Sequence, residues 1–297
     1  MAFLCVDIGG TNTLLGIGNG GFQVIEKFDT EKFLRDVNGK VNEALNDIDY
    51  SRDELEKVAV AAAGPIDREE KTFRPPNFSN SGLGEVDLGE AFQDFGEIYV
   101  VNDGTAAVVG EYHYGDHDAE NLVYVTISSG IGAGVILEGR VIEAWNGNFG
   151  EVGHMKINEE GPECGCGGTA HWEAYSSGDN LPEMAEELFD AQFNSALEIF
   201  RAYQDYSSVA EKVISKMHEA NTIGVTNIAN VFNPEKIVFG GAIPLNHTAM
   251  ILEPLRNEVK RESINRPPEI ELCDLEEYSV LHGLRAVCNG EFKPSQL

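Results

Sequence analysis

The sequence is poor in basic residues. Lysine and arginine number 21 against 50 aspartates and glutamates, so the formal net charge is −29. A surface with this charge repels the phosphates of nucleic acids and anionic lipids, and we expect neither a nucleic acid nor a membrane as a partner. An acidic excess spread along the whole chain is typical of proteins that work at high ionic strength, where salt screens the repulsion. We therefore predict a halophilic source; the alternative is an acidic protein of an ordinary cytosol.

The chain also lacks long apolar runs and a disulfide framework. No stretch of about 20 apolar residues is present, and MAFLCVDIGG enters a strand-like segment without a basic region or a cleavage site. The five cysteines are odd in number and two of them are clustered, which is not the pattern of a secreted, disulfide-stabilised domain. We expect a soluble, cytoplasmic protein in which Cys5, Cys273 and Cys288 are buried thiols.

The 297 residues exceed one average domain, and the patterning predicts an α/β protein with two lobes. Apolar runs at 2–8, 13–18 and 22–28 predict a strand meander, which a helix at 31–48 and a strand at 57–66 follow. The segment from 122 onward repeats the order of strand, glycine turn and strand, which indicates a duplicated fold. We predict a first lobe at 1–115, joined by a C-terminal helix at 278–290, and a second lobe at 116–297.

Three glycine-rich turns follow strands. In DIGGTNT, residues 7–13, successive backbone N–H groups can converge on a phosphate, and Asp7 can face Mg²⁺. TISSGIGAG at 126–134 and GGAIP at 240–244 offer similar turns. The alternative for the first turn is an ordinary hairpin. None of the turns has the P-loop or dinucleotide-binding spacing, so a phosphate site requires another fold.

Asp103 ends the apolar strand IYVVND, at the kind of position where α/β sheets present ligand-binding residues. A carboxylate there can accept the proton of a hydroxyl group that is being phosphorylated. The alternative role is the N-cap of the following helix.

Two histidines and two cysteines lie close together in the sequence, with the spacing H-x9-C-x-C-x4-H: His154, Cys164, Cys166 and His171. Four nitrogen and sulfur ligands favour a closed, tetrahedral zinc site with a structural role. One ring nitrogen of His154 would bind the metal and the other would be free for a ligand hydroxyl. If His171 points outward, only three ligands remain. A redox role is disfavoured because the cysteines are spaced CxC rather than CxxC.

Several motifs appear in an order that resembles the ROK family of repressors, open reading frames and sugar kinases, and the resemblance spans nearly the whole chain. The motifs are DIGGTNT, AAAGPI, VVNDGTAA, TISSGIGAG, FGEVGH, CGCGGTAHWE and VFGGAIP. The resemblance implies the actin-like ATPase fold, with two ribonuclease H-like lobes and with ATP and sugar in the cleft between them. It also implies Mg²⁺, the structural Zn²⁺, and a homodimer or homotetramer.

The resemblance further implies roles for individual residues. The first phosphate turn would be Gly9, Gly10 and Thr11 with the adjoining Asn12, and the second would be Ser128, Ser129 and Gly130. Gly240 and Gly241 would approach the adenosine. Asp103 would be the catalytic base, and the sugar would be bound by Asn102, Glu151, His154, Glu173 and the backbone of Gly64.

The implied activity is ATP-dependent phosphorylation of a hexose, with glucose at its 6-hydroxyl as the first choice. N-acetylhexosamine or fructose kinases of the family are the alternatives. Family repressors carry a helix-turn-helix before the first glycine turn, whereas Asp7 comes too early here for one. The sequence departs from the family pattern at NDGTAA, at SSG, at RPPNFSNSG (74–82), at Ala170 and at His171, where a third cysteine is usual.

Overall fold

A computed structural model describes residues 2–75 and 84–294 of the chain. The chain divides into two compact units. Unit 1 comprises Met1–His117, Val141–Phe149 and Tyr278–Leu297, and unit 2 comprises Asp118–Arg140 and Gly150–Glu277. Unit 1 extends two residues beyond the predicted first lobe, to His117, and it also includes Val141–Phe149.

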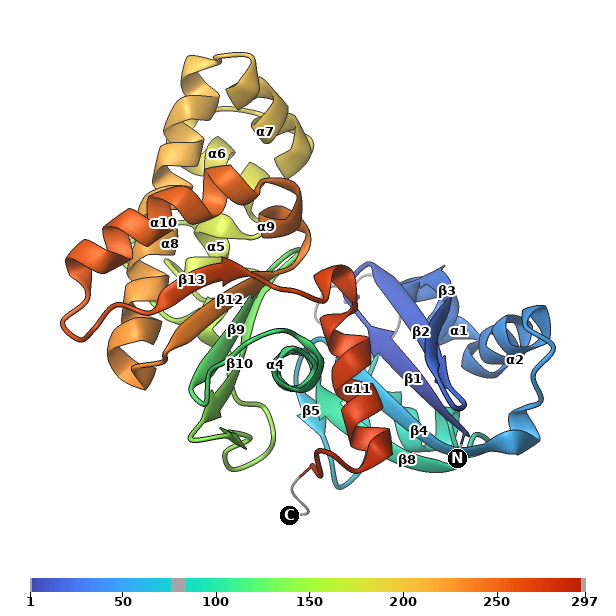
Figure 1. Cartoon of the computed structure of the whole chain (residues 1–297). Helices are drawn as coiled ribbons and strands as arrows, with labels where there is room; N and C mark the ends of the chain where they lie inside the picture. The colour runs from blue at the N-terminus through green and yellow to red at the C-terminus, as the bar shows by residue number, and fades with distance from the viewer. Residues whose placement is uncertain (1, 76–83, 295–297) are drawn as a thin grey trace. The chain divides into compact units, whose positions relative to one another are not determined.

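Unit 1 contains one main sheet, one small sheet and several helices (Figure 1). Its strands are β1 (Ala2–Ile8), β2 (Asn12–Gly18), β3 (Phe22–Asp29), β4 (Leu55–Ala62), β5 (Ile66–Asp67), β6 (Thr72–Phe73), β7 (Val86–Asp87) and β8 (Glu97–Asn102). Its helices are α1 (Thr30–Arg35), α2 (Val37–Asp47), the 3-10 helix η1 (Arg52–Glu54), α3 (Leu88–Ala91), α4 (Asp103–Tyr114) and α11 (Ser279–Asn289).

The main sheet of unit 1 has the order β3-β2-β1-β4-β8. β1 and β2 pair antiparallel, whereas β1, β4 and β8 run parallel. Side chains of β1 alternate between the two faces of the sheet. Leu4 and Val6 belong to the core cluster that includes residues of α1 and α2, and Phe3 and Cys5 belong to the cluster that includes residues of α4 and α11. β1 is therefore buried on both faces, as its continuous apolar run predicts.

The helices α4 and α11 pack closely on that second face because glycines lie at their contact (Figure 1). A Cβ atom on Gly110 would lie 2.0 Å from the carbonyl oxygen of Ser279. A Cβ atom on Gly283 would lie 1.7 Å from the carbonyl oxygen of Ala106. No other residue type fits at these two positions without moving the backbone.

Unit 2 repeats the sheet of unit 1. Its sheet has the order β11-β10-β9-β12-β13, so in both units the sequential strands are arranged third, second, first, fourth and fifth. The strands are β9 (Leu122–Ile127), β10 (Ile131–Leu137), β11 (Arg140–Val141), β12 (Lys236–Gly240) and β13 (Glu269–Leu272). The helices are η2 (Val152–His154), α5 (Trp172–Ser176), α6 (Leu181–Phe189), α7 (Ala196–Gln204), α8 (Ser208–Phe232), α9 (Ala242–Asn246), α10 (Thr248–Glu262) and η3 (Glu276–Tyr278). The predicted duplication is confirmed.

Local polar signals break two segments that the periodicity alone predicts as single helices. The predicted helix 31–48 is two helices, because Asp36 has non-helical backbone angles and caps α2 by accepting a hydrogen bond from Gly39 N. The pattern at 182–203 is also two helices, since α6 ends at the left-handed residue Asp190 and Ser195 caps α7. The small sheet of β5, β6 and β7 was not predicted; its two-residue strands are too short for a periodic signal.

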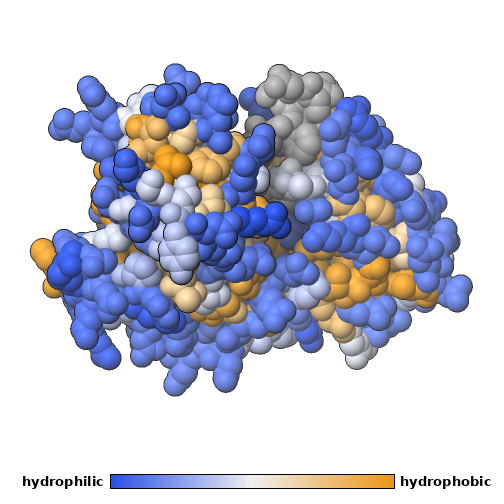
Figure 2. Space-filling view, turned by 90° about the horizontal axis from the view of Figure 1, so that it is seen from above, coloured by the Kyte–Doolittle hydropathy of each residue, from blue (hydrophilic) through white to orange (hydrophobic). Residues whose placement is uncertain are grey.

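The outer face reflects the acidic composition. Hydrophilic residues cover much of the face shown in Figure 2, with apolar residues in smaller patches among them. None of the helices in the described part of the chain is both long and apolar enough to cross a bilayer.

We predict that salt stabilises this fold. With a formal charge of −29, mutual repulsion favours the unfolded chain at low ionic strength, and the screening length falls from about 10 Å at 0.1 M salt to about 3 Å at 1 M. The melting temperature should therefore rise between about 0.1 M and about 1 M KCl. Calorimetry across this range measures it, and a melting temperature that does not change with salt would refute the halophilic interpretation.

Candidate active site

The parallel strands of unit 1 bring four predicted residues to one edge of the sheet. In the strand register, Asp7 on β1 lies beside Ala61 on β4, and Ala62 lies beside Asn102 on β8. Asp103 directly follows Asn102. Gly64, two residues beyond β4, has a φ of 115°, which L side chains rarely adopt. The carboxyl ends of β1, β4 and β8 thus gather these predicted residues, as expected of an open α/β sheet.

Asp7 has a strongly perturbed carboxyl group at this edge. Burial, together with a smaller effect from the negative charge of Asp103, raises its pKa to about 8. Two carboxyl groups this close disfavour each other's ionisation in the absence of a cation. Oxygen ligands of this kind suit Mg²⁺, which is typically held by one or two carboxylates together with phosphate oxygens. The donor set therefore fits a magnesium ion.

Asn102, not Asp103, caps the N-terminus of α4. Asn102 is the N-cap of α4, and its side-chain oxygen accepts a hydrogen bond from Thr105 N at 3.1 Å. Asp103 is the first helical residue, and its Oδ1 accepts from Gly104 N at 2.8 Å. A backbone donor and the N-terminal end of the helix dipole both hold the Asp103 carboxylate in a fixed position.

The first glycine turn, Gly9–Asn12, is braced from outside the turn. Gly9 N donates to Asn12 O at 3.0 Å, and a Cβ atom on Gly9 would lie 2.9 Å from that same oxygen. Thr30, which is fully buried, donates from Oγ1 to Gly9 O at 2.8 Å, and its N–H donates to Thr11 O at 3.0 Å. Sequence reasoning missed Thr30, because only the β2–β3 pairing brings residue 30 to this turn.

The second turn, Ser128–Gly130, joins β9 to β10 in unit 2. Its two serine carbonyls accept hydrogen bonds from Gly178 N at 2.6 Å and Asp179 N at 3.3 Å. Gly241, at the end of β12, has a φ of 87°, and a Cβ atom on it would lie 2.6 Å from Ile127 O. The predicted second phosphate turn and the predicted adenosine turn are therefore neighbours. Gly178 and Asp179 are additional turn residues that the sequence did not single out.

The four predicted metal ligands form a compact cluster in unit 2. One ligand atom from each of His154, Cys164, Cys166 and His171 lies within 4.8 Å of all the others. Cys166 Sγ is 3.3 Å from His171 Nδ1, so His171 does not point outward. Burial is the main cause that lowers the pKa of His171 and raises that of Cys164 to about 12. A neutral imidazole is ready to bind a cation, and a bound cation would draw the proton from the thiol.

The loop that carries the cluster has local reasons for its shape. Cys164 N donates to Gly168 O at 2.8 Å and Gly167 N donates to Cys164 O at 2.7 Å, which folds CGCGG into a tight knuckle. Gly167 has a φ of 86°. A Cβ atom on Gly168 would lie 2.4 Å from His171 Cε1, so a glycine is needed where the ring packs. The spacing of cysteine and glycine thus encodes the geometry.

His154 faces two different groups with its two ring nitrogens. Nδ1 is 3.8 Å from Cys164 Sγ, and Nε2 is 3.8 Å from Glu151 Oε2. Burial raises the pKa of Glu151, although the neighbouring His154 opposes this shift. A ring held by the cluster through Nδ1 would keep Nε2 beside Glu151.

Glu173 touches both the cluster and the second glycine turn. Its Oε2 accepts from Ile131 N at 2.8 Å, and its Oε1 lies 3.8 Å from Cys164 Sγ. A Cβ atom on Gly130 would lie 2.8 Å from Oε2, so Gly130 leaves room for this carboxylate. The predicted sugar ligand Glu173 is thus anchored by the backbone that follows the second turn.

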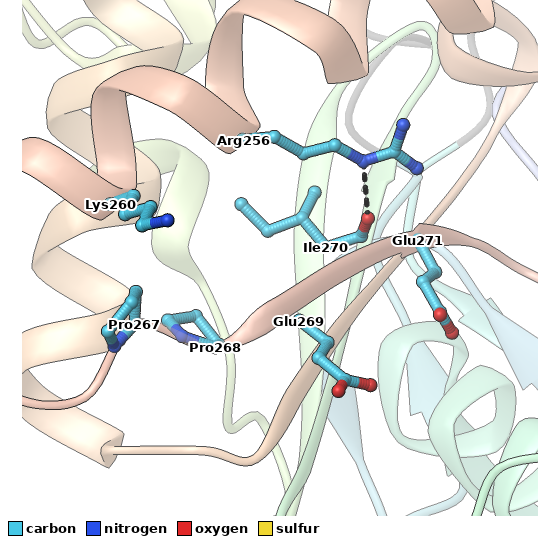
Figure 3. A pocket seen from close by; sticks show the side chains of 7 residues that line it. All are labelled: Arg256, Lys260, Pro267, Pro268, Glu269, Ile270 and Glu271. Atoms are coloured by element: carbon cyan, nitrogen blue, oxygen red, sulfur yellow. Dashed lines mark hydrogen bonds between the residues drawn. The ribbon is translucent and has the colours of Figure 1, made fainter.

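A surface hollow of about 360 Å³ in unit 2 lies away from these residues. It is formed by α10 and β13, and Figure 3 shows that Arg256 donates from Nε to the carbonyl oxygen of Ile270, at 2.8 Å. Glu269 and Glu271 extend from the strand away from Arg256 (Figure 3). None of the predicted site residues lines this hollow, and we assign it no part in the chemistry.

The segment RPPNFSNSG, where the sequence departs from the family pattern, falls mostly outside the described part of the chain, which leaves out its residues 76–82. The remaining predicted residues fall into two compact groups. One follows the carboxyl ends of the strands in unit 1, and the other surrounds the metal cluster and glycine turns of unit 2.

The repeated sheets and the two groups of residues define an α/β protein with a close structural counterpart. The crystal structure of a ROK hexokinase from Thermus thermophilus superposes with a TM-score of 0.77 at 27% identity, covering 96% of both chains. The protein has the actin-like ATPase fold of such sugar kinases, which confirms the predicted fold class.

The chain belongs to the ROK family, whose sequence profile matches residues 3–286. A glucokinase of Aeropyrum pernix is 30% identical over 273 residues, 84% of either chain. A xylose repressor of Bacillus subtilis is 31% identical over 214 residues, which are 68% of this chain and 52% of the repressor. The predicted family is confirmed, and its relatives include both enzymes and regulators.

The raised pKa of Asp7 predicts a pH-dependent stability. Folded Asp7 keeps its proton up to about pH 8, whereas the unfolded chain loses it near the ordinary value of 3.8. Between these values the folded state binds more protons, so the free energy of unfolding falls as pH rises. Asp7→Asn cannot ionise and should melt at least about 3 °C above the wild type at pH 8 without divalent ions, with no such advantage at pH 4.

Melting curves at pH 4–9 in a chelator measure this difference. Added Mg²⁺ should raise the melting temperature of the wild type and leave that of Asp7→Asn unchanged. Equal pH profiles for the two proteins would contradict the assignment of Asp7.

Proposed function

We propose that this protein is an ATP-dependent hexose kinase that phosphorylates glucose at the 6-hydroxyl. The observation that carries the proposal is the carboxyl edge of unit 1: Asp103 is relieved of helix capping by Asn102 and lies beside the buried Asp7. A base and a cation ligand side by side are what phosphoryl transfer to a hydroxyl requires. Membership in the ROK family and the similarity to a glucokinase support the same function.

In the proposed reaction, the Asp103 carboxylate accepts the proton of the sugar hydroxyl while the oxygen of that hydroxyl forms a bond to the terminal phosphorus of ATP. The bond between that phosphorus and the bridging oxygen breaks, and ADP leaves. Backbone N–H groups of the turn at Gly9, Gly10, Thr11 and Asn12 and of the turn at Ser128, Ser129 and Gly130 would stabilise the negative charge of the phosphates. Gly240 and Gly241 would leave room for the adenosine, because neither has a side chain.

Mg²⁺, when bound, neutralises phosphate charge and orients the terminal phosphoryl group. Asp7 would hold this ion, directly or through a water molecule. Its raised pKa means that binding releases the Asp7 proton, so the affinity for Mg²⁺ should increase as pH rises.

Sugar recognition would use groups from several loops. Glu151, His154 and Glu173 offer acceptors and an imidazole nitrogen near the metal cluster, and Asn102 and the backbone of Gly64 offer further partners. Each sugar hydroxyl left without a partner in a water-excluded site would cost about 1–3 kcal/mol. Several charged and polar partners are therefore consistent with a sugar rather than an apolar substrate.

The cluster of His154, Cys164, Cys166 and His171 would hold Zn²⁺. Two sulfur and two nitrogen donors with no carboxylate among them are the composition of a closed, structural zinc site, which would be tetrahedral. The role we propose for the metal is to orient the His154 ring.

We expect purified protein to contain one zinc per chain, and Cys166→Ser to lose most of it. Cys166 is exposed, so the substitution removes a ligand without opening the core. Cys273→Ser, which removes a thiol outside the cluster, should keep the full zinc content. Elemental analysis by mass spectrometry measures both, and wild-type protein free of zinc after purification without chelators would refute the site.

The function is tested by a coupled assay with a panel of glucose, fructose, N-acetylglucosamine and N-acetylmannosamine plus ATP. Glucose should give the largest kcat/KM, and a preference for another sugar would reassign the substrate within the same chemistry. Asp103→Asn should lower kcat by at least about 10²-fold while glucose binding by calorimetry persists. Asp94→Asn, an exposed acidic residue elsewhere in unit 1, is the matched control. Retained turnover in Asp103→Asn would contradict the proposed base.

A sugar-responsive regulator is the second candidate, and the similarity to a xylose repressor is the observation that favours it. The net charge of −29 disfavours DNA binding by this chain. The expected homodimer or homotetramer stays a prediction.

A further inference from the structure

The segment Val141–Phe149 leaves unit 2 and packs within unit 1 before the chain returns to unit 2 at Gly150. Most of it has no regular secondary structure. Ala144 has a positive φ of 53°, and the neighbouring Trp145 is 85% exposed. None of its apolar side chains is among the fully buried residues of the core, and we call this segment the strap.

A buried ion pair holds one part of the strap. Arg68 of unit 1 pairs with Glu143, and their side chains are only 8% and 5% exposed. The guanidinium also lies against Gly147, because a Cβ atom there would be 2.4 Å from Arg68 Nε. Gly147 has a φ of 81°, so both its conformation and its lack of a side chain are needed. A charged pair excluded from water holds its partners in one geometry, since separating them leaves an uncompensated charge.

A pair of hydrogen bonds holds the other part. Asn148 Oδ1 accepts from Ile66 N at 2.8 Å, and Asn148 Nδ2 donates to Ile66 O at 2.8 Å. The side-chain amide thereby pairs with the backbone of β5 as an additional strand would. Ile66 pairs on its own strand ladder with Phe73. The backbone at residue 66 is thus fixed by β6 and by the strap.

Two of the proposed sugar-binding residues are close in sequence to the contact between Asn148 and Ile66. Ile66, whose backbone is hydrogen-bonded to Asn148, comes two residues after Gly64. Asn148 itself comes three residues before Glu151. Gly150, between Asn148 and Glu151, is held in unit 2, where Gly150 O accepts from Ala133 N at 2.9 Å. Few rotatable bonds therefore separate the anchor at Asn148 from the sugar residues on either side of it.

From these contacts we propose that the strap is a positioning element of the sugar site, in which Asn148 and the Arg68–Glu143 pair set the position of Gly64 and the start of the Glu151 loop. The proposal rests on the proposed sugar kinase function. None of the three residues needs to contact the sugar. Their effect is on the placement of groups that do, and small displacements of such groups weaken binding strongly.

The test is Asn148→Ala. It removes both hydrogen bonds to Ile66, and we expect the glucose Kd, measured by calorimetry without ATP, and the glucose KM to rise about tenfold, while the KM for ATP stays within about twofold. Asn42→Ala is the matched control, because it also deletes a side-chain amide that donates to a backbone carbonyl in unit 1, at 2.7 Å, but lies far from the strap in sequence. This control should leave the Kd for glucose and both KM values unchanged.

Gly147→Ala disturbs the strap by a different route, because the added Cβ atom would collide with the Arg68 guanidinium. This variant should also raise the KM for glucose while the KM for ATP stays nearly unchanged. Melting curves separate this effect from unfolding, since a merely structural brace would lower the melting temperature without a selective loss of sugar affinity. If both variants are folded and show the kcat, glucose Kd and glucose KM of the wild type, the proposed positioning role of the strap is wrong. The proposed kinase function would not be affected by that result. A wild type that neither binds nor phosphorylates any sugar would overturn both proposals.

Discussion

The carboxylate of Glu173 connects two parts of unit 2 that are distant in sequence. One oxygen accepts from Ile131 N, directly after the second glycine turn, and the other faces Cys164 in the Cys/His cluster. Since Gly130 lacks a side chain, the carboxylate can approach this turn closely. The shape of the turn and the shape of the cluster loop therefore depend on each other. In the proposed kinase, a metal that orders the loop also orders a phosphate-binding turn and an imidazole for the sugar.

The corresponding constraint in unit 1 is electrostatic. Asp7 is buried near Asp103, and burial with the charge of Asp103 raises its pKa to about 8, so the metal-free site disfavours two negative charges near neutral pH. In the proposed kinase, a bound cation would offset this repulsion and stabilise the ionised form of Asp7. The acidic surface does not oppose an anionic nucleotide strongly, because nearby N–H dipoles and a divalent ion act at short range whereas distant charges are screened.

Much of the fold followed from the sequence because it is encoded locally. The apolar run of β1 and the CxC spacing of the cluster loop are short-range patterns, whereas Gly64 was named only through the family resemblance. The breaks at Asp36 and Asp190 do not follow from apolar periodicity, because a capping aspartate and a left-handed residue cause them. The hydrogen bonds from Thr30 to Gly9 and between Asn148 and Ile66 could not be predicted, because they join residues 21 and 82 positions apart. Such contacts depend on tertiary pairing that no local pattern encodes.

The most direct test of the central claim is a crystal structure of the protein with glucose, with diffraction data collected on both sides of the zinc absorption edge. The account predicts an anomalous peak among His154, Cys164, Cys166 and His171, with His154 Nδ1 on the metal and Nε2 within hydrogen-bond distance of a glucose hydroxyl. Bound glucose with no metal in the cluster, or a sugar that His154 does not touch, would contradict it.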